Sequence, residues 1–157
     1  MSADDIIHRL SQLSLFAKLE PGALRLIAFA AETRHLRAGD ILFREGDVAD
    51  CGYLLLAGAL TLDGANVKGN ESVPKTAKEG DLLGEIALIV TTKRPVTAIA
   101  RQTSTVLRIS RALFLRVLEE YPASADRMRR DVLAHINALN HDLEAFRRGL
   151  ISDVSAV

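Results

Sequence analysis

Residues 84–100 read GEIALIVTTKRPVTAIA and hold one carboxylate and one guanidinium nine positions apart, at Glu85 and Arg94. The run from Glu85 to Ile89 has room for one or two helical turns before TTKRP ends it. The start of such a turn presents free backbone N–H groups and a partial positive charge, which suit a phosphate. Arg94 could pair with the same phosphate, and Glu85 could accept hydrogen bonds from ribose hydroxyls. The segment therefore suits a nucleotide.

The same two charges also fit a simpler interpretation. A Glu and an Arg at this spacing can form a surface ion pair, which stabilises a protein by about 0–1 kcal/mol. The residues on both sides of the segment decide between an ion pair and a nucleotide site.

The region from Thr33 to about Ile109 alternates short apolar runs with turn signals. The turn signals are Gly39-Asp40, Gly46-Asp47, Gly58, Asp63-Gly64, Gly69-Asn70 and Gly80-Asp81. This spacing predicts a compact antiparallel β-barrel or roll over about 33–109. The polar, turn-rich residues 63–80 are expected to form a loose hairpin within it.

Helical patterns precede the β region. Ile6, Leu10 and Leu13 recur at helical spacing, and Pro21 occupies a first-turn position before a second apolar face. We therefore expect two short helices within residues 4–31.

Two further helices are predicted over about 111–150. Ser110 can cap a helix that begins at Arg111, and Pro122 marks a break before a longer helix. The apolar residues of the longer helix have the 3.5-residue period of a coiled-coil seam, at Val132, Ile136, Leu139, Leu143, Phe146 and Leu150. This seam could pack on the barrel or join two copies of the chain in a homodimer, and the sequence leaves both open.

Composition limits the class of protein. A chain of 157 residues with 48% hydrophobic residues can bury one sizeable core, so we expect a single domain over 1–157. Lys plus Arg equal Asp plus Glu at 20 each, so an anion must be bound locally rather than by an overall basic field. The single cysteine, Cys51, excludes an internal disulfide and is expected to be a small buried hydrophobe.

No export or membrane signal is visible. Asp4 and Asp5 stand where an export signal has basic residues, and the longest apolar run, Leu26–Ala31, is far too short to span a bilayer. We expect a cytoplasmic protein without a membrane partner.

The sequence also argues against an enzyme, a metal site and contact with nucleic acid by this chain alone. The histidines His8, His35, His135 and His141 lack the spacing of metal ligands on one strand or helix face. No arrangement of Ser, Cys, His and Asp indicates a nucleophile. The basic residues 127–130 are interpreted as a solvated helix face.

The order of these features resembles one known family. The chain carries GEIAL, a short loop and then R-x-x-T-A on a predicted β-roll between helices. This arrangement resembles the phosphate-binding cassette of cyclic nucleotide-binding domains, such as those of catabolite activator protein and protein kinase A regulatory subunits. The resemblance covers nearly the whole chain. It implies an α+β, mainly β fold: an antiparallel, jelly-roll-like β-roll with N-terminal helices, a short cassette helix and two C-terminal helices.

The resemblance assigns roles to the residues of the segment. Glu85 would accept the ribose 2′-hydroxyl, Arg94 would pair with the exocyclic phosphate oxygens, and Gly84 would let the backbone approach the sugar. The N–H groups of Ile86 and Ala87 would complete the anion site. The full predicted set is Leu83, Gly84, Glu85, Ile86, Ala87, Arg94, Pro95, Val96 and Thr97, with Leu88 and Ile89 anchoring the short helix in the core.

Two positions depart from the family pattern. Pro95 replaces a residue whose N–H can reach the phosphate, and Val96 replaces the usual Ala. Losing one donor to a charged group costs about 1.5–3 kcal/mol where that bond is made. Pro95 also restricts Arg94 to extended geometry, which would hold its side chain in one direction. Because Pro95 has no hydroxyl of the kind that favours cyclic GMP, cyclic AMP is the expected ligand.

We therefore expect a cyclic AMP sensor without its own effector domain, which signals through its C-terminal helices or an unknown effector protein. The base could meet Asn137, Asn140 or His141 at its edge, and Leu133 or Ile136 at its face. The alternatives are a degenerate domain that serves as a dimerisation or docking module, and the sensor fragment of a larger transcription regulator.

Overall fold

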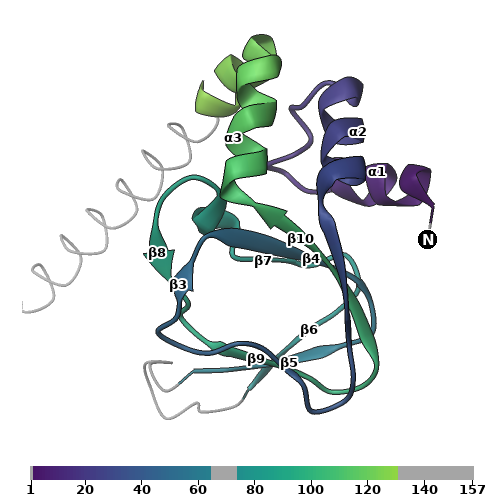
Figure 1. Cartoon of the computed structure of the whole chain (residues 1–157), viewed down its shortest axis with the longest axis vertical. Coiled ribbons are helices and arrows are strands. Elements are labelled where there is room, and N and C mark those ends of the chain that lie inside the picture. The colour runs from purple at the N-terminus through teal and green to yellow at the C-terminus, as the bar shows by residue number, and fades with distance from the viewer. Residues whose placement is uncertain (1, 65–73, 131–157) are drawn as a thin grey trace, which may run out of the picture.

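The computed structural model describes residues 2–64 and 74–130. Within these ranges the chain forms a β-barrel with helices gathered at one end of it (Figure 1). The predicted seam at 132–150 and the predicted base contacts at 133–141 lie outside the described residues.

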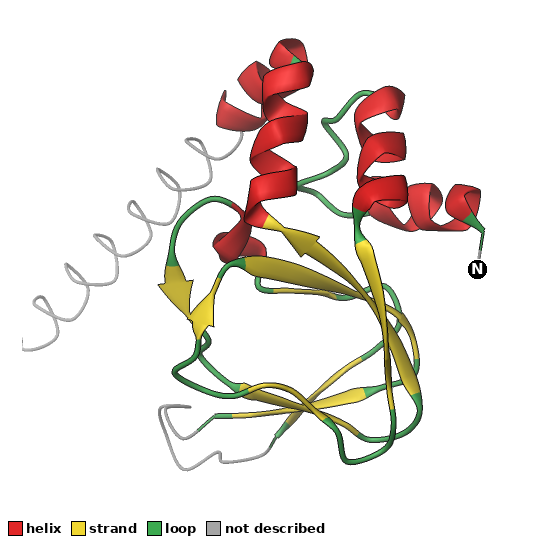
Figure 2. Cartoon of the chain, viewed as in Figure 1, coloured by secondary structure: helices red, strands yellow, loops and turns green. Residues whose placement is uncertain are grey.

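The barrel consists, in the described part, of two four-stranded sheets and a two-stranded ribbon, all antiparallel (Figure 2). The first sheet has the order β1 (Glu32–Leu36), β10 (Ser104–Ser110), β4 (Cys51–Ala57), β7 (Leu82–Leu83). The second has the order β2 (Ile41–Phe43), β9 (Thr97–Ala100), β5 (Leu60–Asp63), β6 (Lys75–Ala77). The ribbon pairs β3 (Val48–Ala49) with β8 (Thr92–Lys93). The predicted antiparallel β-roll is therefore confirmed.

Three of the predicted Gly-Asp turns share one design. In each, the Asp carboxylate accepts a hydrogen bond from the backbone N–H three residues earlier, and the intervening Gly has a φ of 89–93° that other residues rarely adopt. The bonds join Arg37 to Asp40 at 2.8 Å, Arg44 to Asp47 at 3.0 Å and Lys78 to Asp81 at 2.9 Å. The chain thus turns sharply between strands at residues 37–40, 44–47 and 78–81.

The helices begin and end close to where the sequence predicts. They are α1 (Ala3–Ser11), α2 (Pro21–Ala30), the 3₁₀ helix η1 (Glu85–Leu88) and α3 (Arg111–Glu120), followed by a helical run over 122–130. Ser110 caps α3 by accepting a hydrogen bond from the Leu113 N–H at 3.1 Å. None of the helices in the described ranges is long and apolar enough to cross a bilayer.

Strand β4 separates two apolar clusters because its side chains alternate between the faces of the sheet. Leu54 and Leu56 contribute to the helix cluster, in which α1, α2 and α3 pack on the outer face of the sheet. Cys51, Tyr53 and Leu55 contribute to the barrel cluster, which fills the space between the two sheets. Burial on both faces explains why CGYLLLA reads as a nearly continuous apolar run.

Candidate functional site

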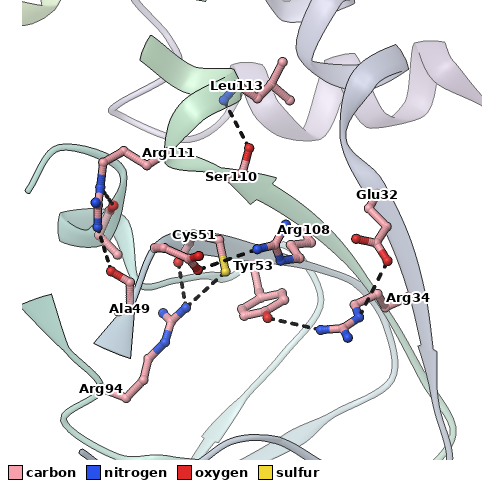
Figure 3. A network of polar contacts seen from close by, with 12 residues as sticks. Glu32, Arg34, Ala49, Cys51, Tyr53, Arg94, Arg108, Ser110, Arg111 and Leu113 are labelled. Carbon is pink, nitrogen blue, oxygen red and sulfur yellow. Dashed lines mark hydrogen bonds and ion pairs between the residues drawn. The ribbon is translucent and has the colours of Figure 1, made fainter. Parts of the chain in front are cut away.

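Arg94 follows β8 directly and turns its side chain into the barrel. Only 4% of the residue is exposed. Its Nη2 donates hydrogen bonds to the Cys51 carbonyl oxygen at 2.8 Å and to Cys51 Sγ at 3.2 Å (Figure 3). Cys51 is buried, as predicted, but it is also a direct partner of the predicted phosphate-binding arginine.

Two aromatic rings lie beside the Arg94 guanidinium. Its central carbon lies 4.5 Å from the centroid of the Phe43 ring and 5.4 Å from that of Tyr53. The two rings stack with centroids 5.9 Å apart and an interplanar angle of 23°. Such cation–π contacts stabilise a cation that has lost most of its water.

One donor nitrogen of this guanidinium has no partner. Arg94 Nη1 is buried and makes no hydrogen bond, and it lies directly beside Gly84. Gly84 has a φ of 79°, and a Cβ at this position would collide with Nη1 and approach the Cys51 carbonyl oxygen to 3.2 Å. The positive φ and the position of Arg94 Nη1 both favour Gly here. The approach of a sugar, which the sequence analysis gave as the reason for Gly84, stays a prediction.

Helix η1 begins immediately after Gly84. Glu85 and Ile86 are exposed, whereas Ala87 and Leu88 are buried. The Ala87 N–H donates to the Gly84 carbonyl oxygen at 3.0 Å, so this N–H, which we expected to face an anion, is used within the turn. Leu88 anchors η1 in the core as predicted.

The remaining residues of the predicted set lie around this centre. Leu83 and Val96 pack against the barrel cluster, and Pro95 is exposed. The Thr97 hydroxyl accepts a hydrogen bond from the Glu45 N–H at 2.9 Å. Ile89, which we expected to anchor η1 in the core together with Leu88, remains 37% exposed.

The surface ion-pair interpretation of the two charges is not supported. Among the described residues, neither Glu85 nor Arg94 takes part in an ion pair, and one side chain is exposed while the other is buried. The segment thus holds a buried guanidinium with a spare donor beside the start of a short helix that carries an exposed carboxylate.

Tyr53 links this centre to the outside of the barrel. Burial is the main cause that raises the pKa of its phenol, and a hydrogen bond and charge interaction with Cys51 add to the effect. The Tyr53 hydroxyl accepts a hydrogen bond from Arg34 Nη1 at 3.3 Å, as Figure 3 shows. The phenol is therefore held in its neutral form to a higher pH than a free tyrosine.

Sequence reasoning missed Phe43, Cys51 and Tyr53 as partners of Arg94. The alternation in β4 places Cys51 and Tyr53 on one face, and this signal is visible in the sequence. Their contact with a residue about 40 positions later depends on how β8 returns beside β3, which no local pattern reveals. In the described ranges, no three His, Cys, Asp or Glu side chains are placed to hold a metal ion.

Comparison with known proteins agrees with this architecture. A family model described as the cyclic nucleotide-binding domain matches residues 33–121. The structure of a cyclic nucleotide-binding-like protein from Brucella abortus is 45% identical in sequence and superposes with a TM-score of 0.67, covering 74% of this chain and 99% of that chain.

Curated relatives are much longer proteins. The cAMP-dependent protein kinase regulatory subunit of Blastocladiella emersonii is 29% identical over 140 residues, which cover 88% of this chain and 34% of the relative. Lysophospholipase nte1 of Neurospora crassa is 28% identical over 146 residues, which cover 90% of this chain and 10% of the relative. The chain therefore spans only about a third or a tenth of these relatives.

The family match extends over more than half of the chain and includes the β-barrel, η1, Arg94 and α3. Together with the similarity to the Brucella structure, it shows that the chain belongs to the cyclic nucleotide-binding domain family.

Proposed function

We propose that this chain is a cyclic AMP sensor whose binding site is formed by Glu85, Arg94 and the start of η1. Arg94 pairs with the exocyclic phosphate oxygens, and Glu85 accepts a hydrogen bond from the ribose 2′-hydroxyl. The observation that carries the proposal is the buried, unpartnered Arg94 Nη1 beside Gly84. A buried donor without a partner costs about 1–3 kcal/mol, and a charged donor costs more. A phosphate oxygen that accepts a hydrogen bond from Nη1 would remove this cost.

Ligand access requires a local rearrangement. Nη1 is covered from solvent, and the other terminal nitrogen, Nη2, donates hydrogen bonds to Cys51. A phosphate therefore reaches Nη1 only when the guanidinium or the start of η1 shifts outward. This shift costs free energy, which lowers the affinity relative to a site that is already open.

One observation favours cyclic AMP over cyclic GMP as the ligand: Pro95 offers no hydroxyl to the base. We include in the proposal that the domain is a cytoplasmic regulatory module rather than an enzyme. It transmits occupancy through its C-terminal helices, through homodimerisation along the predicted seam, or through an effector protein.

A second function is favoured by one feature of the site. Arg94 is enclosed by Phe43, Tyr53 and Cys51, and Pro95 lacks an N–H that could draw a phosphate toward it. A domain closed in this way would serve as a dimerisation or docking module that no longer binds nucleotide.

Calorimetric titration separates the two functions. The wild-type chain is titrated with cyclic AMP, cyclic GMP, 5′-AMP and 2′-deoxy cyclic AMP. The sensor function predicts that cyclic AMP binds most tightly and that Arg94→Ala weakens it at least about tenfold. Arg116→Ala, which removes an exposed arginine of α3, is the matched control and leaves the affinity unchanged.

The 2′-deoxy analogue tests Glu85 in a double-mutant cycle. Wild type should discriminate between cyclic AMP and its 2′-deoxy form, and Glu85→Gln should lose most of that discrimination. If no cyclic nucleotide binds at tens of micromolar, the docking function is correct. If cyclic AMP binds and Arg94→Ala does not weaken it, the nucleotide site lies elsewhere on the chain.

A further inference from the structure

Arg111, the first residue of α3, makes four side-chain hydrogen bonds to segments far from it in sequence. Its Nε donates to the Ala87 carbonyl oxygen at 2.7 Å, and its Nη1 donates to Thr91 Oγ1 at 3.1 Å. Its Nη2 donates to the carbonyl oxygens of Ala49 at 2.7 Å and Val90 at 3.2 Å, and the contact with Ala49 is visible in Figure 3. All nitrogens of this guanidinium are therefore engaged.

These bonds reach both sides of the proposed nucleotide site. Ala87, Val90 and Thr91 belong to the end of η1 and the loop after it. Ala49 belongs to β3, which pairs with β8 through Ala49 and Thr92, and β8 ends one residue before Arg94. One side chain on α3 thus holds the segment that carries Glu85 and the ribbon that carries Arg94.

The chemistry of the contacts suits a fixed guanidinium. The last carbonyl groups of a helical turn lack partners within it and attract a cation. The planar guanidinium can donate in several fixed directions at once, which a lysine ammonium on a flexible stem cannot reproduce. The Arg111 backbone N–H adds a bond to the Asp50 carbonyl oxygen at 2.8 Å, so its main chain is anchored beside β3 as well.

We propose that Arg111 is a positioning residue for cyclic nucleotide binding: it sets the place of η1 and β8, and thereby the distance between Glu85 and Arg94. It does not contact the nucleotide. The predicted effect on cyclic AMP affinity rests on the proposed function. The predicted effect on the segment 84–93, which includes η1 and β8, can be measured without ligand. Sequence analysis identified Arg111 only as the start of a helix.

The test compares Arg111→Gln and Arg111→Lys with Arg116→Gln, a control on the same helix whose side chain is exposed. Amide hydrogen exchange is measured without ligand over 84–93, with the buried strand 51–57 as internal reference. Cyclic AMP affinity is then measured by calorimetry. Thr91→Val, which removes a single bond to Arg111, serves as a milder variant in case Arg111→Gln does not fold.

We expect Arg111→Gln to accelerate exchange in 84–93 at least about tenfold while 51–57 keeps its protection. Cyclic AMP affinity should fall at least about tenfold. Arg111→Lys should recover only part of both effects, Thr91→Val should produce the smaller change in the same direction, and Arg116→Gln should produce neither.

The inference is overturned if exchange in 84–93 stays at the wild-type rate, or if the loop loosens and cyclic AMP affinity does not change. Full recovery by Arg111→Lys also overturns it, because a point charge would then suffice. If wild type binds no cyclic nucleotide, the proposed sensor function fails, and faster exchange in 84–93 alone then shows whether Arg111 positions this loop.

Discussion

The two apolar clusters on either side of β4 differ in one respect that separates stability from function. In the described ranges the helix cluster encloses no buried charged side chain, and Phe16 and Phe114 lie in edge-to-face contact within it at 5.7 Å. The barrel cluster encloses the Arg94 guanidinium against Phe43 and Tyr53. Burying a cation with an unpaired donor costs free energy of folding, so a protein that keeps such a group is expected to need it for function. We therefore interpret the helix cluster as the part that stabilises the fold and the barrel interior as the location of the proposed site.

The largest expected effect comes from breaking the helix cluster. Phe114→Ala removes a side chain that is 1% exposed and should lower the free energy of unfolding by about 3–5 kcal/mol. Denaturant unfolding followed by circular dichroism measures this loss. A loss below about 1 kcal/mol would show that the helices contribute little to the fold.

The opposite sign is expected in the barrel cluster. Arg94→Met replaces the buried cation by an apolar side chain of similar length, and the free energy of unfolding should be unchanged or rise by up to about 4 kcal/mol. Binding of cyclic AMP should be lost in the same variant. A marked loss of stability would mean that the bonds to Cys51 and the two aromatic rings outweigh the cost of burying the charge. The same denaturation experiment as for Phe114→Ala allows the two clusters to be compared directly.

The sequence predicts the helices, strands and turns better than the surroundings of Arg94 and Arg111, and the reason is physical. Capping at Ser110, the break at Pro122 and the Gly-Asp turns are local signals, so the elements and their order follow from short stretches. The spacing of Glu85 and Arg94 also identifies the segment that carries the proposed site. The inward direction of Arg94 and the four bonds of Arg111 depend on partners 20 or more positions away. Such contacts are set by tertiary packing, which single-sequence patterns do not contain.

A third prediction concerns the close approach between η1 and Arg94. Gly84→Ala introduces a Cβ that collides with Arg94 Nη1 at a φ of 79°. Left-handed backbone at a residue other than Gly costs about 1–3 kcal/mol, and displacing the Arg94 guanidinium adds to this cost, so the free energy of unfolding should fall by more than in a variant with backbone strain alone. Gly80→Ala is the matched control, because it has a similar φ of 93° but open space around its Cβ. If both variants lose the same stability, backbone strain alone explains the effect and the collision with Arg94 contributes nothing.

The smallest expected effect is a pH dependence that belongs to the barrel cluster alone. Burial, assisted by Cys51, raises the pKa of Tyr53 above the usual value of 10.0, against the opposing charges of Arg34 and Arg108. The folded state therefore holds this proton more tightly than the unfolded state. Its contribution to stability is fully present below pH 10 and is lost as the pH rises through the folded pKa. The free energy of unfolding of wild type should thus decline more steeply above pH 10 than that of Tyr53→Phe. Equal slopes for wild type and Tyr53→Phe would show that the pKa of this phenol is the same in the folded and the unfolded state, so that burial in the barrel does not raise it.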